Sequence, residues 1–302
     1  MPHSSSPNNV ARRLRRKVQR ISAIGAWRDY ASNQRSLGHT VGLVPTMGAL
    51  HAGHLSLFRE AKSRGDIVLA TIFVNPRQFN DVKDLTAYPR TPELDHTSAE
   101  AHGVDCLVEP TLEEMWPAYP NPTATTVSVR GVSDTLEGAG RPGHFDGVAS
   151  VVAKLFAVTG SCRAYFGEKD FQQIAVIRQM VRDLALDVEV VSCPIVRDED
   201  GLALSSRNVL LSLDARKKAV ALSRSLLAAR AESAPASELR ARMREVLEGS
   251  GVEVAYADVV DPVTLVPVGD DETGERRALI AGLVDGVRLI DNAPVIVEAR
   301  RG

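Results

Sequence analysis

The segment from residue 41 to residue 64 constrains the fold most, because a buried strand, a tight turn and a helix follow one another in it. Residues 41–44 are apolar and Pro45 follows, which predicts a strand that ends there. Apolar residues then return at helical spacing over 55–64. Such a helix has free backbone N–H groups at its start, and these favour an anion. The segment predicts a strand-turn-helix unit of an α/β fold with an anion-binding turn.

The same alternation continues through the first two thirds of the chain. Apolar runs predict strands at 41–44, 67–74, 104–108, 164–166 and 188–191, and helical patterns predict helices at 55–64, 92–102, 147–158 and 171–184. The run over 67–74 is almost continuously apolar, which is typical of a strand buried on both faces. We therefore predict a Rossmann-like, doubly wound parallel sheet over 21–194, with ligands at the carboxyl ends of its strands.

The pattern changes after Pro194. Helical patterns at 214–232 and 237–247 are followed by β-like runs at 252–260, 277–283 and 287–290. Helices followed by strands indicate a smaller α+β domain, which we place at 195–302 as a lid. Between 111 and 147 the sequence is irregular and rich in Pro and Gly. Two interpretations of that insertion are open: a wall or lid of the substrate site, or a surface loop that packs Trp116.

Composition excludes several classes of protein. The 302 residues are 44% hydrophobic and 25% charged, as in globular proteins, and the net charge of −2 creates no field that would recruit nucleic acid. No apolar run reaches the length of about 18 residues that a membrane span requires. The three cysteines are widely spaced and show no C-x-x-C pattern, so neither a disulfide framework nor a cysteine zinc site is indicated. Residues 1–20 are basic and contain no acid, which predicts a mobile tail, with a transit peptide as the alternative.

The turn after the first strand carries two histidines, His51 and His54. If the helix begins near residue 52, the two imidazoles face the same side and can donate N–H bonds to one phosphate. A zinc pair fits less well, because helical zinc pairs prefer a spacing of four residues with a Glu between them. A histidine pair alone is also compatible with a simple helix cap.

Two further segments have the chemistry of phosphate sites. Gly167-Glu168-Lys169-Asp170 follows an apolar run and precedes a helix, so that Lys169 offers a mobile positive charge to phosphate. Leu204-Ser205-Ser206-Arg207 offers hydroxyls and a guanidinium from a loop. Taken alone, each segment is better explained as an ordinary helix cap.

Several short sequence motifs occur in the order found in the pantothenate synthetase family, which the chain resembles and which lies within the H-x-G-H nucleotidylyltransferase and class I synthetase-like superfamily. They are Pro45-Thr46-Met47-Gly48, His51-Ala52-Gly53-His54, Ile72-Phe73-Val74-Asn75-Pro76, Tyr88-Pro89-Arg90-Thr91, Gly167-Glu168-Lys169-Asp170 and Leu204-Ser205-Ser206-Arg207-Asn208. The resemblance spans most of the chain from about 41 to 292. Arg77 stands where the family commonly has Met, so a change in the local pocket or surface is an open question.

The resemblance implies a ligase that condenses pantoate with β-alanine, using ATP, through a pantoyl adenylate, and releases pantothenate, AMP and pyrophosphate. It also implies Mg²⁺ with ATP, for which no protein ligand is named, a homodimer and a cytoplasmic location. Two rivals stay open: a nucleotidylyltransferase of the same superfamily, and a nucleotide-binding regulator without catalytic activity.

The resemblance also implies roles for individual residues. The expected catalytic residues are His51, His54 and Lys169, with His54 also as a proton donor. The residues expected to bind ATP are Met47, His51, His54, Gly167, Lys169, Asp170, Val196, Leu204, Ser205, Ser206 and Arg207. Those expected to bind pantoate or β-alanine are Asn75, Gln78 and Gln173, whose amides suit hydroxyls and carboxylates.

Overall fold

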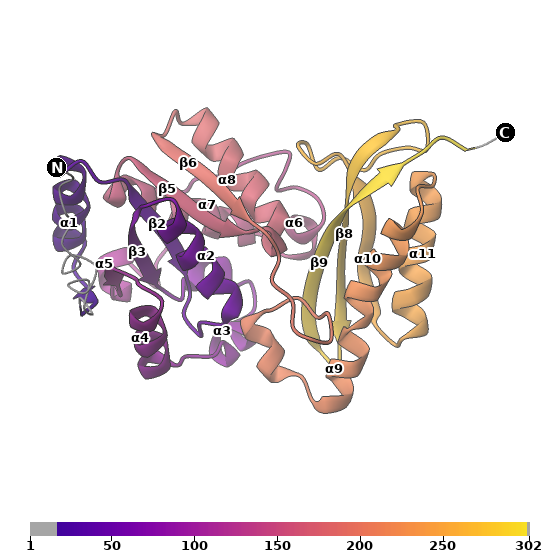
Figure 1. The fold of residues 1–302 in the computed structure, drawn as a ribbon, viewed down its shortest axis with the longest axis horizontal. Coiled ribbons are helices and arrows are strands. Elements are labelled where there is room, and N and C mark those ends of the chain that lie inside the picture. Colours follow the sequence, from indigo (N-terminus) through magenta and orange to yellow (C-terminus); the bar gives the residue numbers. More distant parts are fainter. Residues whose placement is uncertain (1–16, 301–302) are drawn as a thin grey trace, which may run out of the picture.

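The computed structural model describes residues 17–300 and contains two sheets (Figure 1). The first is a six-stranded parallel sheet with the strand order β1-β4-β3-β2-β5-β6. Its strands are β1 (Gln19–Ile21), β2 (Val41–Thr46), β3 (Ile67–Ile72), β4 (Cys106–Val108), β5 (Cys162–Gly167) and β6 (Val188–Cys193). The predicted parallel α/β sheet is confirmed, and all five of the predicted strands are present.

Helices cover both faces of this sheet. The helices of this part of the chain are α1 (Ile24–Ser36), α2 (Ala52–Ser63), α3 (Val82–Ala87), α4 (Pro92–Ala101), α5 (Leu112–Met115), α6 (Glu137–Gly140), α7 (His144–Thr159) and α8 (Phe171–Asp183). Apolar side chains of α1, α7 and α8 share one core with Leu43 and Leu69, whereas those of α2 and α4 share another with Val44 and Ala70. Neighbouring strand residues thus enter opposite cores, as the pleat of a strand requires.

The strand order reverses between β2 and β5. From β2 the chain moves outward through β3 to β4, and it later returns to place β5 on the other side of β2. Ligands of open α/β sheets bind at such a reversal, outside the carboxyl ends of the strands. The turns that follow β2 and β5 are those in which the sequence analysis predicted phosphate contacts.

The second sheet is antiparallel and consists of β7 (Glu253–Val260), β8 (Gly274–Val284) and β9 (Val287–Val297). It is accompanied by α9 (Leu213–Ala219), α10 (Ala221–Ala231) and α11 (Ala236–Gly249). Ala278 and Ile280 of β8 pack in a core with these helices, whereas Leu279 between them packs in the core of the parallel sheet. The antiparallel sheet therefore lies between its own helices and the first part of the chain (Figure 1).

Two predictions about elements need correction, and some elements were not predicted. The helix predicted over 214–232 is two helices, which meet at Val220. The tail predicted over 1–20 is too long at its end, because β1 begins at Gln19 and pairs with β4; residues 1–16 lie outside the described part. The sequence analysis also missed α1, whose Trp27 and Ala31 are fully buried.

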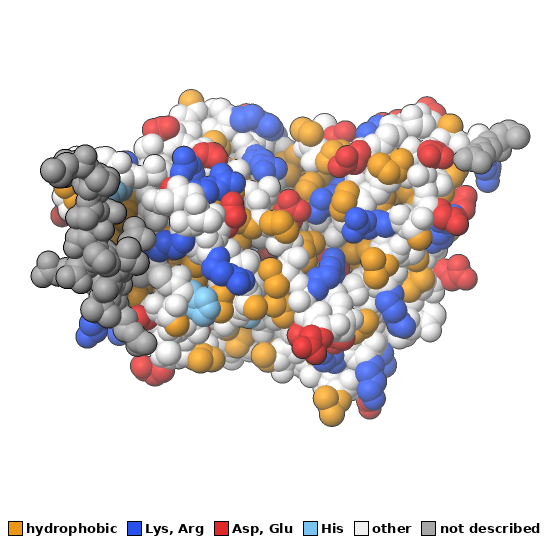
Figure 2. Space-filling model, in the orientation of Figure 1, with side chains coloured by type: hydrophobic (Ala, Val, Ile, Leu, Met, Phe, Trp, Pro, Cys, Tyr) orange, Lys and Arg blue, Asp and Glu red, His pale blue; other side chains and the backbone are white. Residues whose placement is uncertain are grey.

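Charged side chains of both signs are mixed over the face of the molecule shown in Figure 2, with apolar side chains between them. Within residues 17–300, no helix has both the length and the apolar character needed to cross a membrane.

Candidate active site

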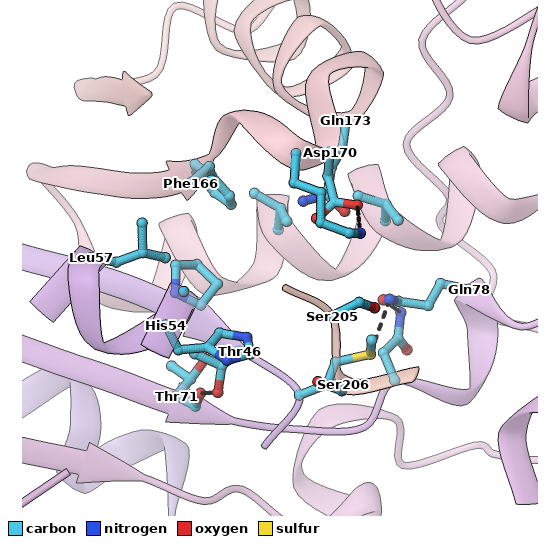
Figure 3. A pocket seen from close by; sticks show the side chains of 18 of the residues that line it. Thr46, His54, Leu57, Thr71, Gln78, Phe166, Asp170, Gln173, Ser205 and Ser206 are labelled. Carbon is cyan, nitrogen blue, oxygen red and sulfur yellow. Dashed lines mark hydrogen bonds and ion pairs between the residues drawn. The ribbon is translucent and has the colours of Figure 1, made fainter. Parts of the chain in front are cut away.

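One cavity lies at the carboxyl ends of β2 and β5, where the strand order reverses (Figure 3). All of the residues that the sequence analysis selected line it: Met47, His51, His54, Asn75, Gln78, Gly167, Lys169, Asp170, Gln173, Val196, Leu204, Ser205, Ser206 and Arg207. These residues come from the turn after β2, the segment after β3, the turn after β5 with the start of α8, and the loop after β6, which are far apart in the sequence. The fold thus brings the candidate residues together, and their individual roles stay predictions.

The turn between β2 and α2 is held by a buried carboxylate of α4. Asp95 is 2% exposed, and its oxygens accept hydrogen bonds from the backbone N–H groups of Ala49 at 2.9 Å and Leu50 at 2.7 Å. Gly48 has φ of +80°, and a Cβ at this position would lie 3.0 Å from Asp95 Oδ2. The turn therefore requires glycine both for its conformation and for its contact with Asp95.

His51 and His54 cap helix α2 with their side chains. Nδ1 of His51 accepts a hydrogen bond from the Gly53 N–H at 3.2 Å, and Nδ1 of His54 accepts one from the His51 N–H at 3.3 Å. Because each Nδ1 is an acceptor, the neutral imidazole carries its proton on Nε2. The ring centroids are 4.1 Å apart. The helix therefore begins with two neighbouring Nε2–H donors at the cavity.

Both imidazoles are neutral at pH 7. Burial, with a further contribution from the positive charge of Lys169, lowers the pKa of His51 to about 4. Burial and the neighbouring His51 lower the pKa of His54 to about 3. The pair is therefore suited to hydrogen-bond donation to an anion. Gly53 makes this arrangement sterically possible, because a Cβ there would lie 2.8 Å from Cε1 of His51.

The turn after β5 presents Lys169 to the cavity and is held by hydrogen bonds from the second sheet. Nζ of Lys169 lies 3.3 Å from Oδ1 of Asp170. Asn292 of β9 is 1% exposed, and its Nδ2 donates hydrogen bonds to the carbonyl oxygens of Glu168 at 2.9 Å and Lys169 at 3.0 Å. The position of the lysine thus depends on a residue more than 120 positions later in the chain.

The loop after β6 reaches back to the first turn. Oγ of Ser206 donates a hydrogen bond to the carbonyl oxygen of Ala49 at 3.4 Å. Arg207 makes a two-point ion pair with Asp84 of α3, at 3.1 Å from Nε and 2.8 Å from Nη2. The loop therefore brings hydroxyls and a guanidinium next to the histidine cap.

Amide side chains lie on both sides of the cavity, with Gln78 near the end of β3 and Gln173 on α8 (Figure 3). Asn75 is 1% exposed, and its Nδ2 donates a hydrogen bond to Oε1 of Gln78 at 3.1 Å. Nε2 of Gln78 lies 3.1 Å from the sulfur of Met47. These contacts fix Gln78 at the cavity wall, where its amide offers an uncharged polar group.

The irregular segment over 111–147 fits both of its interpretations in part. Arg141 lines the cavity, as does His144 at the start of α7. Trp116 is buried, and its Nε1 donates a hydrogen bond to Oδ1 of Asn75 at 2.9 Å. The Arg77 guanidinium lies over the Trp116 ring at 5.1 Å from the centroid. Arg77, which departs from the family pattern, therefore stabilises the insertion and does not line the cavity.

The sequence analysis missed four residues that shape the site: Asp95, Asn292, Arg141 and His144. Asp95 reads as an ordinary acid in the first turn of a helix, and Asn292 as a strand residue. The signal for the other two was their place in a glycine-rich segment next to α7, which was interpreted as a wall without naming a side chain.

A metal ion was expected to accompany ATP. Across residues 17–300, no group of three or more His, Cys, Asp or Glu side chains is placed to hold one. The described side chains therefore do not form a dedicated Mg²⁺ cage.

A parallel sheet whose two central strands each lead into a turn of the phosphate-binding type, with a third such loop beside them, is the arrangement typical of nucleotide-using α/β enzymes. Residues 18–294 match the family described as pantoate-beta-alanine ligase. The chain belongs to this family, and its activity is the ATP-dependent ligation of pantoate and β-alanine.

Relatives and solved structures agree with this assignment. The chain is 50% identical to pantothenate synthetase of Paracoccus denitrificans over 283 residues, which cover 92% of this chain and 98% of the relative. The structure resembles that of pantothenate synthetase from Thermus thermophilus with a TM-score of 0.84 and 45% identity, covering 91% of this chain and 99% of the other. A ligase from Francisella tularensis, complexed with beta-gamma ATP and beta-alanine, has a TM-score of 0.75 and 32% identity, with coverage of 91% and 97%.

Proposed function

We propose that this ligase works in two steps, with pantoyl adenylate as the intermediate. A carboxylate does not react with an amine until its oxygen becomes a good leaving group. Transfer of AMP to the pantoate carboxylate provides this and releases pyrophosphate; the amine of β-alanine then attacks the carbonyl carbon and AMP leaves. The observation that carries the proposal is the meeting, in one cavity, of the neutral histidine cap, Lys169 and the loop over 204–207.

His51 and His54 donate Nε2–H bonds to ATP phosphate in this scheme. Preorganised donors stabilise negative charge that grows on phosphate oxygens as pyrophosphate departs. The low pKa values of both rings favour hydrogen-bond donation over transfer of a proton from His54. Lys169 adds a positive charge from the opposite turn, and Arg207 adds another from the loop.

The other site residues hold the substrates. The residues that contact ATP are Met47, Gly167, Asp170, Val196, Leu204, Ser205 and Ser206. Those that hold pantoate are Asn75, Gln78 and Gln173. Uncharged amides match the hydroxyls of pantoate and leave its carboxylate free to attack. The complex of the Francisella relative with beta-gamma ATP and beta-alanine supports binding of both substrates by this ligase.

The assignment carries four further proposals. Mg²⁺ would accompany ATP, whose phosphates would supply most of its ligands, since Mg²⁺ bound with nucleotide needs few protein ligands. The chain divides into a nucleotide- and pantoate-binding domain over 21–194 and a lid domain over 195–302. It forms a homodimer and acts in the cytoplasm. Sedimentation analysis of the purified protein tests the dimer.

Release of AMP tests the activity against its rivals. The ligase requires ATP, pantoate and β-alanine together for continuous AMP release. A nucleotidylyltransferase would need one acceptor and would release pyrophosphate without AMP, and a regulator would release neither. Omission of each substrate in turn separates the three, and AMP release that does not depend on β-alanine would contradict the ligase.

A further inference from the structure

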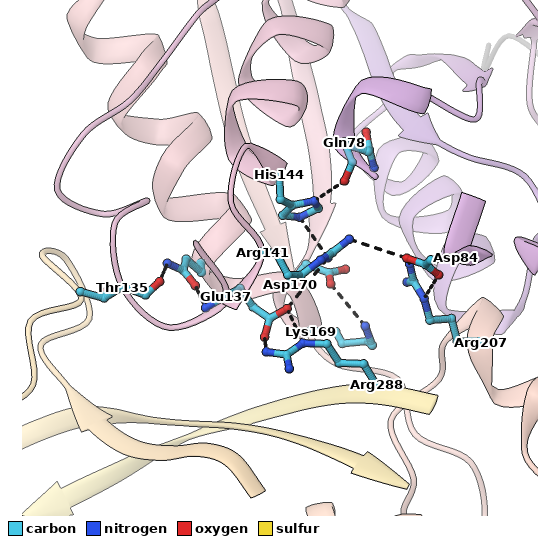
Figure 4. A network of polar contacts seen from close by, with 11 residues as sticks. Gln78, Asp84, Thr135, Glu137, Arg141, His144, Lys169, Asp170, Arg207 and Arg288 are labelled. Atoms are coloured by element: carbon cyan, nitrogen blue, oxygen red, sulfur yellow. Dashed lines mark hydrogen bonds and ion pairs between the residues drawn. The ribbon is translucent and has the colours of Figure 1, made fainter. Parts of the chain in front are cut away.

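Arg141 lies at the cavity wall next to the amide side chains. His144 Nδ1 donates a hydrogen bond to the backbone carbonyl oxygen of Gln78 at 2.7 Å, so a neutral His144 ring has a lone pair on Nε2. Nη1 of Arg141 lies 3.3 Å from that Nε2 and donates to it. Burial, followed by the positive charge of Arg141, lowers the pKa of His144 to about 4, so the ring stays an acceptor at pH 7. One imidazole therefore fixes the guanidinium next to Gln78 (Figure 4).

The charge of Arg141 is weakly paired within the protein. Its nearest carboxylate oxygens are those of Asp84 at 3.8 Å and Glu137 at 3.9 Å. Both of these acids make closer ion pairs with other arginines, Asp84 with Arg207 at 2.8 Å and Glu137 with Arg288 (Figure 4). The Arg141 side chain is 15% exposed, and burial lowers the pKa of its guanidinium. A buried cation with long ion pairs gains from a substrate anion.

Three anionic groups enter the cavity during the reaction: the phosphates of ATP, the carboxylate of pantoate and the carboxylate of β-alanine. The phosphates meet the histidine cap, Lys169 and the loop over 204–207. The pantoate carboxylate loses its charge when the adenylate forms. The β-alanine carboxylate keeps its charge throughout, and the residues expected to bind pantoate or β-alanine, Asn75, Gln78 and Gln173, carry no positive charge to pair with it.

We propose that Arg141 binds the carboxylate of β-alanine and directs its amine toward the pantoyl adenylate. The inference rests on the proposed two-step reaction and assigns the amine substrate a site separate from that of pantoate. Two methylenes separate the carboxylate of β-alanine from its amine. With the carboxylate on Arg141, the amine reaches toward the adenylate held beside Gln78.

The two half-reactions separate this role from the alternatives. Pantoate-dependent exchange of pyrophosphate into ATP reports on nucleotide and pantoate without β-alanine. Steady-state AMP release reports on the complete reaction. The variant is Arg141→Gln, and the matched control is Arg130→Gln, an exposed arginine of the same irregular segment that does not line the cavity.

We expect Arg141→Gln to exchange pyrophosphate within about threefold of wild type and to raise the KM for β-alanine by about 10- to 100-fold, the range for a charge-assisted hydrogen bond. Wild type should prefer β-alanine to its neutral amide, and the variant should lose most of this preference. Arg130→Gln should change neither. Arg141→Lys keeps the charge without the planar fork, and it should fall between the two; it provides the same test if the glutamine variant does not fold.

Three results would overturn the assignment. Exchange that falls as much as the complete reaction in folded Arg141→Gln would place the guanidinium on phosphate or on pantoate. An unchanged preference for β-alanine over its amide in the folded variant would exclude a carboxylate contact. Wild-type protein without pantoate-dependent exchange would remove the two-step reaction, and the Arg141 assignment with it.

Discussion

Substitution of Gly53 by Ala tests the histidine cap most selectively. Gly53 is the second residue of α2, and a Cβ there would lie 2.8 Å from Cε1 and 2.9 Å from Nδ1 of His51. Carbon atoms do not approach so closely, so the imidazole must turn away. It then loses the hydrogen bond that the Gly53 N–H donates to Nδ1, and its Nε2–H no longer has the same direction.

The effects on stability and on rate should differ widely. Loss of a capping hydrogen bond costs about 1 kcal/mol of unfolding free energy. Replacement of glycine by alanine within a helix contributes about 0.5–1 kcal/mol in the opposite direction. The net change in unfolding free energy should therefore stay below about 1 kcal/mol. Displacement of one preorganised phosphate donor should lower the rate of adenylate formation by about 10²-fold.

Pyrophosphate exchange and urea unfolding measure the two effects on one protein sample. Gly25→Ala is a matched control, because Gly25 is also the second residue of its helix, α1, and a Cβ there would meet no heavy atom within 4 Å. The control should keep the exchange rate of wild type. An unchanged exchange rate in Gly53→Ala, or an equal loss in the control, would refute the role of the cap.

Three further predictions follow from the site. The pKa values of His51 and His54 are lowered to about 4 and 3 from the usual 6.5, so the unfolded state binds more protons than the folded state at pH values below about 6.5. The free energy of unfolding should therefore fall as the pH drops from about 6.5 to 4, and it should fall less steeply in an Asn variant of either residue. Urea unfolding at a series of pH values measures this. Lys169→Ala should mainly impair the use of ATP and Gln173→Ala that of pantoate, and steady-state kinetics that show a defect toward ATP alone in the second variant would contradict its assignment. Backbone amides over 197–207 should exchange hydrogen more slowly with a bound ATP analogue, and equal protection at saturation would argue against a loop that orders on nucleotide.

The sequence predicted the elements whose signal is local. Strands such as β3 are nearly continuous apolar runs, and the turn after β2 combines glycine, histidine and a helical start within ten residues. The placement of these turns at one sheet edge follows from the rule that parallel strands share their carboxyl ends. This is why the candidate residues, which belong to motifs far apart in the sequence, line one cavity.

The features that the sequence did not predict depend on contacts between distant segments. Asp95 acts on a turn that lies 45 residues or more earlier, and Asn292 holds a turn more than 120 residues earlier. No periodicity marks such a residue. β1 has only three residues, too few to show an apolar pattern. Most residues of α1 are polar, and the signal for this helix was the helical spacing of Ile24, Trp27 and Ala31.

The measurement that tests the central claim most directly is isotope exchange between pyrophosphate and ATP in the absence of β-alanine. We expect exchange to require pantoate and to proceed without the amine. The amine, with a pKa of about 10, is largely protonated near pH 7 and reacts only with a carboxyl group that is already activated. Exchange that strictly requires β-alanine would contradict a separate adenylate step, and exchange that proceeds without pantoate would contradict activation of pantoate at this site.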